Sequence, residues 1–381
     1  MKLYLLVATG NIGMQVLDIV DLNPHDFEVE TIAAGRNIQL VEKIIDKYQP
    51  KYVSVLLKEA AKRLEEKYPN ILFGYGDDGL VNAATFGNET DGLVVNSIVG
   101  SAGLLPTYEA IKKKRNIALA NKETLVIGGD IIMPLAKKNG VSIIPIDSEH
   151  SALMHCLKGE NIKDVKKLVI TASGGSFRNK TRRELKNVTV KDALNHPNWT
   201  MGAKITIDSA TMMNKGFEII EAHHLFDIDY DDIEAVLHKE SIVHALVEFN
   251  DHSYVAHLGM PDMRVPINAA LYFPKRNQYQ SPKLSLTDIG ALHFTVLDGT
   301  RYPLLKHAIK ACKKGGYAPT VLNAANEAAV ALFLDGKITF LQIEEIVLEC
   351  LNMFDEKASL TIDKIIAMDE KVKDYVNKAH S

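Results

Sequence analysis

Apolar and polar residues form two alternating patterns along the first 147 residues. Short runs of consecutive apolar residues, typical of strands buried on both faces, alternate with stretches that have the spacing of amphipathic helices. The runs predict strands over Leu3–Ala8, Val29–Ala34, Tyr52–Val55, Leu93–Ser97, Asn116–Ala120 and Val141–Ile146, and the spacing predicts helices over Ile12–Val20 and Ile38–Tyr48. This alternation indicates an α/β domain over residues 1–147, a Rossmann-like parallel sheet covered on both faces.

The pattern changes after residue 147. Ser241–Phe249 and Ser253–Leu258 flank Asn250-Asp251-His252, which predicts a hairpin in an α+β middle domain over residues 148–272. Residues 273–298, which contain Pro274, Pro282 and Gly290 and are followed by Gly299, are expected to form a linker. Residues 299–381 predict a helical domain, in which Thr320 caps a run to Leu334 and Thr339 precedes a run to Phe354.

Composition narrows the function classes. The net charge is −4, so no general attraction to nucleic acid or to an anionic membrane surface is expected. The three cysteines show no paired spacing, which favours a reducing compartment and disfavours a thiolate zinc site. No apolar run reaches the roughly 18 residues of a membrane span, and the first apolar run is too short for a signal peptide. We expect a soluble, cytoplasmic protein.

The turn after the first strand is a candidate dinucleotide site. Its sequence is Val7-Ala8-Thr9-Gly10-Asn11-Ile12-Gly13, in which two glycines stand three apart but the first glycine position of the usual fingerprint holds Val7. The second strand ends in Gly35-Arg36-Asn37, where an enzyme that uses NAD would carry an acidic residue. A cationic Arg36 suits the 2′-phosphate of NADP. The alternative is that Arg36 is a solvated surface charge.

Two polar clusters contain candidate metal and phosphate ligands. Asp147 and Glu149 end a predicted strand and project to the same side in an extended chain. The alternative for this segment is a helix cap by Asp147 or Ser148. The second cluster, Lys204–Glu218, offers Ser209, Asn214 and Lys215 for a phosphate. Glu218 adds a third carboxylate, with Glu221 one turn further on; oxygen ligands alone favour Mg²⁺ or Mn²⁺ over zinc.

Several motifs together resemble the 1-deoxy-D-xylulose 5-phosphate reductoisomerases of the non-mevalonate (MEP) pathway of isoprenoid biosynthesis. The resemblance covers essentially the whole chain. The segments that carry it are Leu119–Glu123, Ile146–His150, Thr171–Arg178, His196–Trp199, Lys204–Glu221, Gly259–Arg264 and Asn323–Glu327. The stretch Asp208-Ser209-Ala210-Thr211-Met212-Met213-Asn214-Lys215-Gly216 is long and unusual in composition, so a chance match is remote.

The resemblance implies an NADP-dependent oxidoreductase and isomerase. It would rearrange and reduce 1-deoxy-D-xylulose 5-phosphate to 2-C-methyl-D-erythritol 4-phosphate with NADPH and Mg²⁺ or Mn²⁺, as a homodimer. Asp147, Glu149 and Glu218 would bind the metal. Substrate contacts would come from Lys122, Ser148, Ser173, His196, Trp199, Ser209, Asn214 and Lys215, and NADPH contacts from Thr9, Gly10, Asn11, Ile12, Gly35, Arg36, Asn37, Asn121 and Glu123.

The segment 176–203 is long enough to close over a substrate as a mobile lid that carries His196 and Trp199. His150 and His244 also occupy family positions, although His244, in an alternating strand, fits a buried sheet histidine at least as well. The chain departs from the family at Val7, where a glycine is usual, and at Asn11, where a serine is common. This departure bears on cofactor affinity.

Two other functions remain to be distinguished. One is a plain NADPH-dependent reductase of another sugar phosphate, which product analysis would identify because only the rearrangement gives a branched carbon skeleton. The other is a non-catalytic nucleotide-sensing protein on an enzyme scaffold. Loss of a metal carboxylate or phosphate ligand would favour it, and none is lost.

Overall fold

The computed structural model describes residues 1–88, 90–356 and 359–380. They form two compact units. The N-terminal unit comprises residues 1–124, 130–147 and 263–280, and the second unit comprises residues 125–129, 148–262 and 281–381. Each unit has its own sheet, and each is described below by itself.

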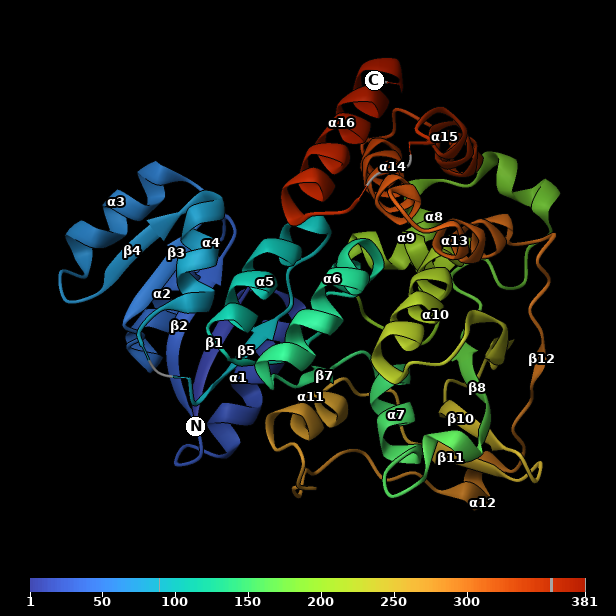
Figure 1. The fold of residues 1–381 in the computed structure, drawn as a ribbon, viewed down its shortest axis with the longest axis horizontal. Helices are drawn as coiled ribbons and strands as arrows, with labels where there is room; N and C mark the ends of the chain where they lie inside the picture. Colours follow the sequence, from blue (N-terminus) through green and yellow to red (C-terminus); the bar gives the residue numbers. More distant parts are fainter. Residues whose placement is uncertain (89, 357–358, 381) are drawn as a thin grey trace. The chain divides into compact units, whose positions relative to one another are not determined.

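The N-terminal unit is built on a parallel sheet with the order β4-β3-β2-β1-β5-β6-β7 (Figure 1). Leu3 and Leu6 on the central strand are fully buried. This burial explains why the strand lacks polar alternation and confirms the predicted sheet. The strands are β1 (Lys2–Leu6), β2 (Glu28–Ala34), β3 (Tyr52–Val55), β4 (Leu72–Tyr75), β5 (Gly92–Asn96), β6 (Asn116–Leu119) and β7 (Ile143–Pro145).

Helices connect these strands, as parallel pairing requires. They are α1 (Asn11–Leu22), α2 (Ile38–Tyr48), α3 (Lys58–Lys67), α4 (Gly76–Thr85), α5 (Leu104–Lys112) and α6 (Glu123–Asn139). A further helix of this unit, α11 (Arg264–Leu271), comes from the later segment. Helix α4 packs on β1, β2 and β3, and α11 packs on α1. Strand order reverses between β1 and β5, so the loops that follow these two strands flank the position where such sheets bind ligands.

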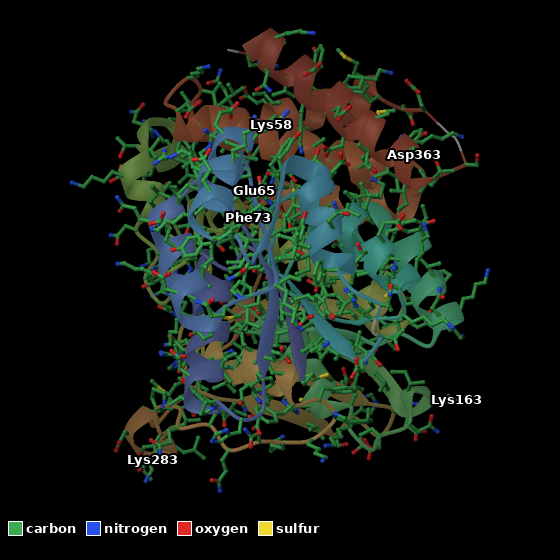
Figure 2. All side chains as sticks on the ribbon, turned by 90° about the vertical axis from the view of Figure 1, so that its left-hand side faces the viewer. Lys58, Glu65, Phe73, Lys163, Lys283 and Asp363 are labelled. Atoms are coloured by element: carbon green, nitrogen blue, oxygen red, sulfur yellow. The ribbon has the colours of Figure 1, made fainter. Side chains whose placement is uncertain are left out.

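Two details of this sheet differ from the prediction. Strand β1 ends at Leu6 rather than Ala8 because Val7 has a φ of 70°, a left-handed conformation that no strand can continue. Strand β4 was not predicted, since Leu72 is exposed and Gly74 interrupts the apolar run. Figure 2 labels Phe73 on this edge strand, beside Lys58 and Glu65 of α3.

The second unit contains a mixed sheet with the order β11-β10-β8-β9-β12. Strands β10 and β11 pair antiparallel, with Val247 opposite Val255, which confirms the predicted hairpin. The strands are β8 (Val165–Ala172), β9 (Ile233–Leu237), β10 (Val243–Phe249), β11 (Tyr254–Leu258) and β12 (Thr295–Val296). Side chains such as Leu168, Ile170 and Val247 form its core with residues from the surrounding helices.

The remaining helices belong to the second unit. They are α7 (Ser148–Cys156), α8 (Val190–Leu194), α9 (Ala203–Thr211), α10 (Met213–Phe226), α12 (Leu286–Ile289), α13 (Pro303–Lys314), α14 (Ala318–Leu334), α15 (Phe340–Met353) and α16 (Ile362–His380), with short 3-10 turns at Ile162–Asp164, Arg182–Asn187 and Tyr230–Asp232. A further 3-10 turn, Ser101–Gly103, belongs to the N-terminal unit. Helix α15 follows Thr339, as predicted, and Thr339 forms a capping box with Gln342. The predicted cap at Thr320 is wrong, because α14 begins two residues earlier with Pro319 in its first turn and buries Thr320.

The grouping of segments differs from the predicted division at residues 148–272, 273–298 and 299–381. Helix α11 and the residues up to 280 belong to the N-terminal unit, where Tyr272 packs edge-on against Phe27. Residues 295–296, inside the predicted linker, pair with β9. The C-terminal helices and the middle region share one unit. Among the described residues, no helix has the combination of length and apolar character needed to cross a bilayer.

Candidate active site

Three carboxylates gather where β7 gives way to α7. Asp147 follows β7 directly, Glu149 lies in the first turn of α7, and Glu218 lies on α10. One oxygen of each lies within 4.8 Å of the others. Glu218 is buried, and Asp147 and Glu149 are half-buried. Like charges this close repel one another unless a cation lies among them. An all-oxygen donor set of this kind fits Mg²⁺ or Mn²⁺.

Two side chains of α10 hold these carboxylates together in the structure. The Lys215 ammonium donates to Glu149 Oε1 at 2.7 Å and also to Glu218 Oε2, while the Asn214 amide donates to Glu218 Oε1. Burial by itself lowers the pKa of Lys215, but the Glu149 and Glu218 carboxylates outweigh burial and raise the pKa above its ordinary value. Lys215 therefore carries a positive charge in the place where the carboxylates need one.

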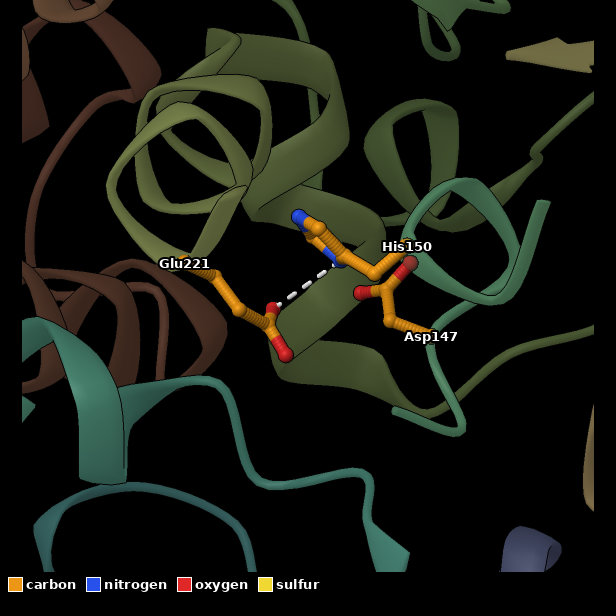
Figure 3. Close-up of side chains that lie close together, drawn as sticks. All are labelled: Asp147, His150 and Glu221. Carbon is orange, nitrogen blue, oxygen red and sulfur yellow. Dashed lines mark ion pairs between the residues drawn. The ribbon is translucent and has the colours of Figure 1, made fainter. Parts of the chain in front are cut away.

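His150 ties α7 to α10 (Figure 3). Its Nε2 donates to the main-chain carbonyl of Glu218 at 2.8 Å, and its Nδ1 lies 3.3 Å from Glu221 Oε2. Both side chains are fully buried. The hydrogen bond fixes the distance between the two helices that carry Glu149 and Glu218, so His150 supports the carboxylate pair from behind.

Lys122 and Asp147 form a second buried ion pair. Lys122 Nζ lies 2.5 Å from Asp147 Oδ2, and Lys122 is only 5% exposed. Lys122 directly precedes α6 and follows β6, whose neighbour β7 ends before Asp147. The parallel register of β6 and β7 thus brings both side chains to one edge of the sheet. Ser148 Oγ, next along the chain, donates to Glu149 Oε2 at 2.5 Å.

The predicted phosphate ligands lie on two adjoining segments of the second unit. Ser173 follows β8, and the turn continues through Gly174 and Gly175, both with positive φ. A Cβ on Gly175 would lie 2.5 Å from the main-chain oxygen of Ser209, so only glycine permits this approach to α9. The turn therefore brings the Ser173 loop beside Ser209, with Asn214 and Lys215 at the start of α10.

His196 reaches the same loop with a defined tautomer. Its Nδ1 accepts from the main-chain N–H groups of Asn198 and Trp199, so Nε2 carries the proton and donates to Ser173 Oγ at 3.0 Å. Burial, aided by the nearby Arg178 charge, lowers the pKa of His196 to about 4. His196 is accordingly a neutral donor at physiological pH. Trp199 lies tilted against His244, a buried histidine of β10, with 6.3 Å between ring centroids.

Packing limits the part of 176–203 that is available to move. Phe177 is buried edge-on against Phe340, Leu185 is buried, and Arg182 pairs with Glu344 of α15. In helix α8, Ala193 is buried and its carbonyl accepts from Ser176 Oγ. No side chain within the described residues 195–202 is buried. Within them, the Asn198 amide donates to Lys239 O and Ser241 Oγ at 2.7 Å each.

In the turn after β1, Val7 adopts a backbone conformation that is usual for glycine. Val7 has a φ of 70°, which is a strained value for a β-branched residue. Gly13 is needed there, since a Cβ on it would lie 2.3 Å from Val7 O. Thr9 lies in the turn, Gly10 caps α1, and Asn11 and Ile12 begin the helix. The first N–H groups of α1 are thus directed to the end of β1, as anion binding requires.

The other predicted cofactor residues divide into two kinds. Arg36 and Asn37 are exposed after β2, next to the β1 turn, and Asn37 Oδ1 caps α2. Gly35 precedes them. Asn121 and Glu123 are instead buried: the Asn121 amide donates to Ile98 O and Gly100 O at 2.8 and 2.9 Å and to Glu123 Oε2. Asn121 therefore stabilises the conformation of the loop after β5 through hydrogen bonds to its main chain.

The loop over residues 97–101 is a further candidate for the cofactor site that was not predicted from the sequence. It follows β5, the strand next to β1 at which the strand order reverses. Ser97 Oγ donates to Leu6 O at 2.7 Å, Val99 is 65% exposed and Gly100 has a φ of 79°. A Gly-Ser pair after a predicted strand was the available signal, but only the strand order shows that this strand borders β1.

Family models match three segments of the chain. A model described as 1-deoxy-D-xylulose 5-phosphate reductoisomerase matches residues 3–129. A model of the C-terminal domain of the same enzyme matches residues 143–226, and one described as DXP reductoisomerase C-terminal domain matches residues 258–375. Together these matches extend over most of the chain.

Named relatives are similar along nearly their whole length. The 1-deoxy-D-xylulose 5-phosphate reductoisomerase of Geobacillus sp. (strain WCH70) is 50% identical over 374 residues, covering 98% of each chain. Reductoisomerase 1 of Bacillus anthracis is 49% identical over 98% of this chain and 97% of its own. A DOX-P reductoisomerase crystallised with NADPH, fosmidomycin and magnesium aligns with a TM-score of 0.94 at 38% identity, covering 99% and 98% of the two chains. The Zymomonas mobilis enzyme with NADPH aligns at 0.91 and 36%, covering 100% and 99%. The chain belongs to the 1-deoxy-D-xylulose 5-phosphate reductoisomerase family.

Proposed function

We propose that this protein converts 1-deoxy-D-xylulose 5-phosphate to 2-C-methyl-D-erythritol 4-phosphate with NADPH and a divalent metal, as a step of the non-mevalonate pathway of isoprenoid biosynthesis. The observation that carries the proposal is the meeting of the Asp147, Glu149 and Glu218 carboxylates within 4.8 Å of one another, with phosphate-type donors on the same helix as Glu218. The hydrogen bonds from Lys215 and Asn214 to these carboxylates support the proposal, because an exposed cluster of acidic side chains would be screened by water and would not need such partners.

Asp147, Glu149 and Glu218 would hold the metal, which polarises a carbonyl and stabilises negative charge that develops on neighbouring oxygens. NADPH supplies the hydride for the reduction. Lys122, held by Asp147, would place its ammonium against substrate oxygens, and Ser148 would add a hydroxyl beside Glu149. Both side chains are oriented before substrate binds, which lowers the entropic cost of reaching the reactive geometry.

Ser173, Ser209, Asn214 and Lys215 would bind the substrate phosphate. The Gly174-Gly175 turn supports this role because it brings Ser173 beside Ser209. Phosphate binding at a distance from the reacting carbons supplies energy that orients them. His196 would donate its Nε2 proton to a phosphate oxygen in place of Ser173, and residues 195–202, with Trp199, would close over the substrate and exclude water.

Thr9, Gly10, Asn11 and Ile12 would line the NADPH site with Gly35, Arg36 and Asn37. The exposed guanidinium of Arg36 at the end of β2 suits the 2′-phosphate. We add the loop 97–101 to this site, with Asn121 and Glu123 as its supports. In this assignment residues 1–147 form the cofactor domain, 148–272 the catalytic domain and 299–381 a helical domain.

We also propose a cytoplasmic homodimer that accepts Mn²⁺ as well as Mg²⁺. Strand β11 lies at an edge of its sheet, and Tyr254 and Val255 are 54% and 39% exposed, which suits pairing with a second copy. The three cysteines are buried thiols, in keeping with a reducing compartment. Light scattering coupled to size exclusion should give twice the chain mass, and a monomer at micromolar concentration would contradict the dimer.

A direct assay tests the function. Purified protein should oxidise NADPH only when 1-deoxy-D-xylulose 5-phosphate and Mg²⁺ or Mn²⁺ are both present, and NMR of the product should show the branched carbon skeleton. An unbranched reduced product would instead establish a plain sugar phosphate reductase. Absence of NADPH oxidation with all components present would overturn the proposal.

A further inference from the structure

In this structure, carboxylates of the proposed metal site accept hydrogen bonds from side chains that are proposed to bind the substrate phosphate. Both oxygens of Glu218 are occupied by residues assigned to the phosphate: Oε1 accepts from Asn214 and Oε2 accepts from Lys215. Lys215 also binds Glu149 Oε1 at 2.7 Å. All four side chains belong to the second unit, on α7 and α10.

Helical spacing explains the arrangement. Asn214 and Lys215 precede Glu218 by four and three residues, the separations at which side chains on one helix meet. Each N–H that is donated to Glu149 or Glu218 is not available to a phosphate oxygen, and these contacts use two of the three N–H groups of Lys215 and one of the two of Asn214. A metal ion bound by Glu149 and Glu218 would also be repelled by an ammonium group lying on the same two carboxylates. Lys215 and the metal therefore compete for one pair of carboxylates.

We propose that Lys215, with Asn214, makes metal binding depend on the phosphate group, so that these two residues select phosphorylated substrates through the metal site as well as through direct contact. The inference rests on the proposed function, because it takes Asn214 and Lys215 as the phosphate ligands. A bound phosphate draws the ammonium and the amide away from Glu218, and Glu149 and Glu218 become available to the metal. Linkage makes the effect reciprocal: the metal strengthens phosphate binding by the same factor.

The experiment measures Mn²⁺ affinity by electron paramagnetic resonance of the free ion, with and without methyl phosphate, a phosphate monoester that has no chelating oxygens on its carbon. Protein-free samples correct for Mn²⁺ bound by methyl phosphate itself. In the wild type, saturating methyl phosphate should tighten Mn²⁺ binding about fivefold or more. An unchanged Mn²⁺ affinity would overturn the inference.

The Lys215→Met variant tests whether the Lys215 ammonium competes with the metal or serves only as a phosphate ligand. If the ammonium competes with the metal, this variant binds Mn²⁺ at least about fivefold more tightly than wild type without methyl phosphate, and methyl phosphate has no further effect. If Lys215 were only a phosphate ligand, its Mn²⁺ affinity without methyl phosphate would equal that of wild type, and the inference would fail.

Two further variants complete the test. Lys167→Met also removes one lysine charge, but Lys167 pairs with Glu234 of β9 and not with the proposed metal ligands. The Mn²⁺ affinity of this variant should match that of wild type. Should circular dichroism show that Lys215→Met does not fold, Asn214→Ala should give the same changes with smaller size, and unchanged affinity there would overturn the inference. Turnover of the wild type is measured separately: turnover without coupling refutes the coupling alone, and coupling without turnover refutes the proposed function.

Discussion

The proposed metal and phosphate site around α10 and the proposed cofactor turn after β1 differ in the groups that would bind a charged ligand. Around α10, buried side chains bind one another: Lys215 contacts Glu149 and Glu218, and His150 contacts Glu218 and Glu221. In the turn after β1, the groups directed at a ligand are main-chain N–H groups, and the side chain that defines the turn, Val7, makes it with a strained φ.

The difference shows which positions tolerate change. A buried charge network depends on the identity of every member, since removal of one charge leaves its partner uncompensated in a medium of low dielectric constant. A turn that presents its backbone depends on conformation. Another residue can adopt that conformation at a cost of about 1–2 kcal/mol. Val7 in a glycine position is therefore compatible with the fold, whereas a change at Glu149 or Glu218 is not expected to be compatible with activity.

The largest expected effect comes from Glu149. The Glu149→Gln variant removes a carboxylate charge from the proposed metal site, and kcat should fall at least about 10²-fold. NADPH binding, measured by fluorescence titration, should stay close to wild type because Glu149 lies outside the proposed cofactor site. Glu234→Gln, at an exposed carboxylate paired with Lys167, is the matched control and should retain full activity. Normal turnover by Glu149→Gln would remove this residue from the ligand set.

A smaller effect concerns the pH dependence of stability through His196. The pKa of this group is lowered from 6.5 to about 4 by burial and by Arg178. Between these two values the unfolded chain binds more protons than the folded one, so the stabilisation is complete above pH 6.5 and is lost as the pH falls toward 4. After allowance for partial exposure, the loss should be about 2 kcal/mol.

Urea unfolding at a series of pH values measures this loss. His196→Gln cannot titrate, so its stability should fall less over the same range than that of wild type. Identical pH profiles for the two proteins would show that His196 is not the group responsible.

The smallest expected effect concerns the turn after β1. Val7→Gly removes the left-handed strain of a β-branched residue, and the free energy of unfolding should rise by about 1 kcal/mol after the larger entropy of an unfolded glycine is subtracted. NADPH should bind more tightly, because the relaxed turn presents its N–H groups with less distortion.

Gln49→Gly is the matched control for Val7→Gly. Gln49 also has a left-handed conformation, with a φ of 48°, but it ends α2 away from the turn. This variant removes the left-handed strain together with the Gln49 amide hydrogen bonds to Ile45 O and Asp46 O, and it should leave the dissociation constant for NADPH unchanged. If both variants changed NADPH binding equally, the local role of Val7 would be refuted.

Elements with a strong pattern were predictable from the sequence. The parallel strands of the N-terminal unit, the hairpin of β10 and β11, and the cap of α15 at Thr339 all follow from local residue order. Strand β4 was not predictable in this way, because an exposed edge strand with a glycine lacks the apolar run on which the prediction relies. The start of α14 was misplaced because Pro319 in the first turn marks a helix start as well as Thr320 does.

For the site, the sequence determined which chemistry is present: three carboxylates, phosphate-type donors, a cationic residue after β2, and motifs characteristic of one family. These are properties of residue type and spacing, and local order is sufficient to define them. Only the tertiary structure decided that Glu218 reaches Glu149 across two helices, that Asn214 and Lys215 engage Glu218, and that the 97–101 loop lies beside the β1 turn. Those contacts join residues far apart in the chain, and packing and strand order set them.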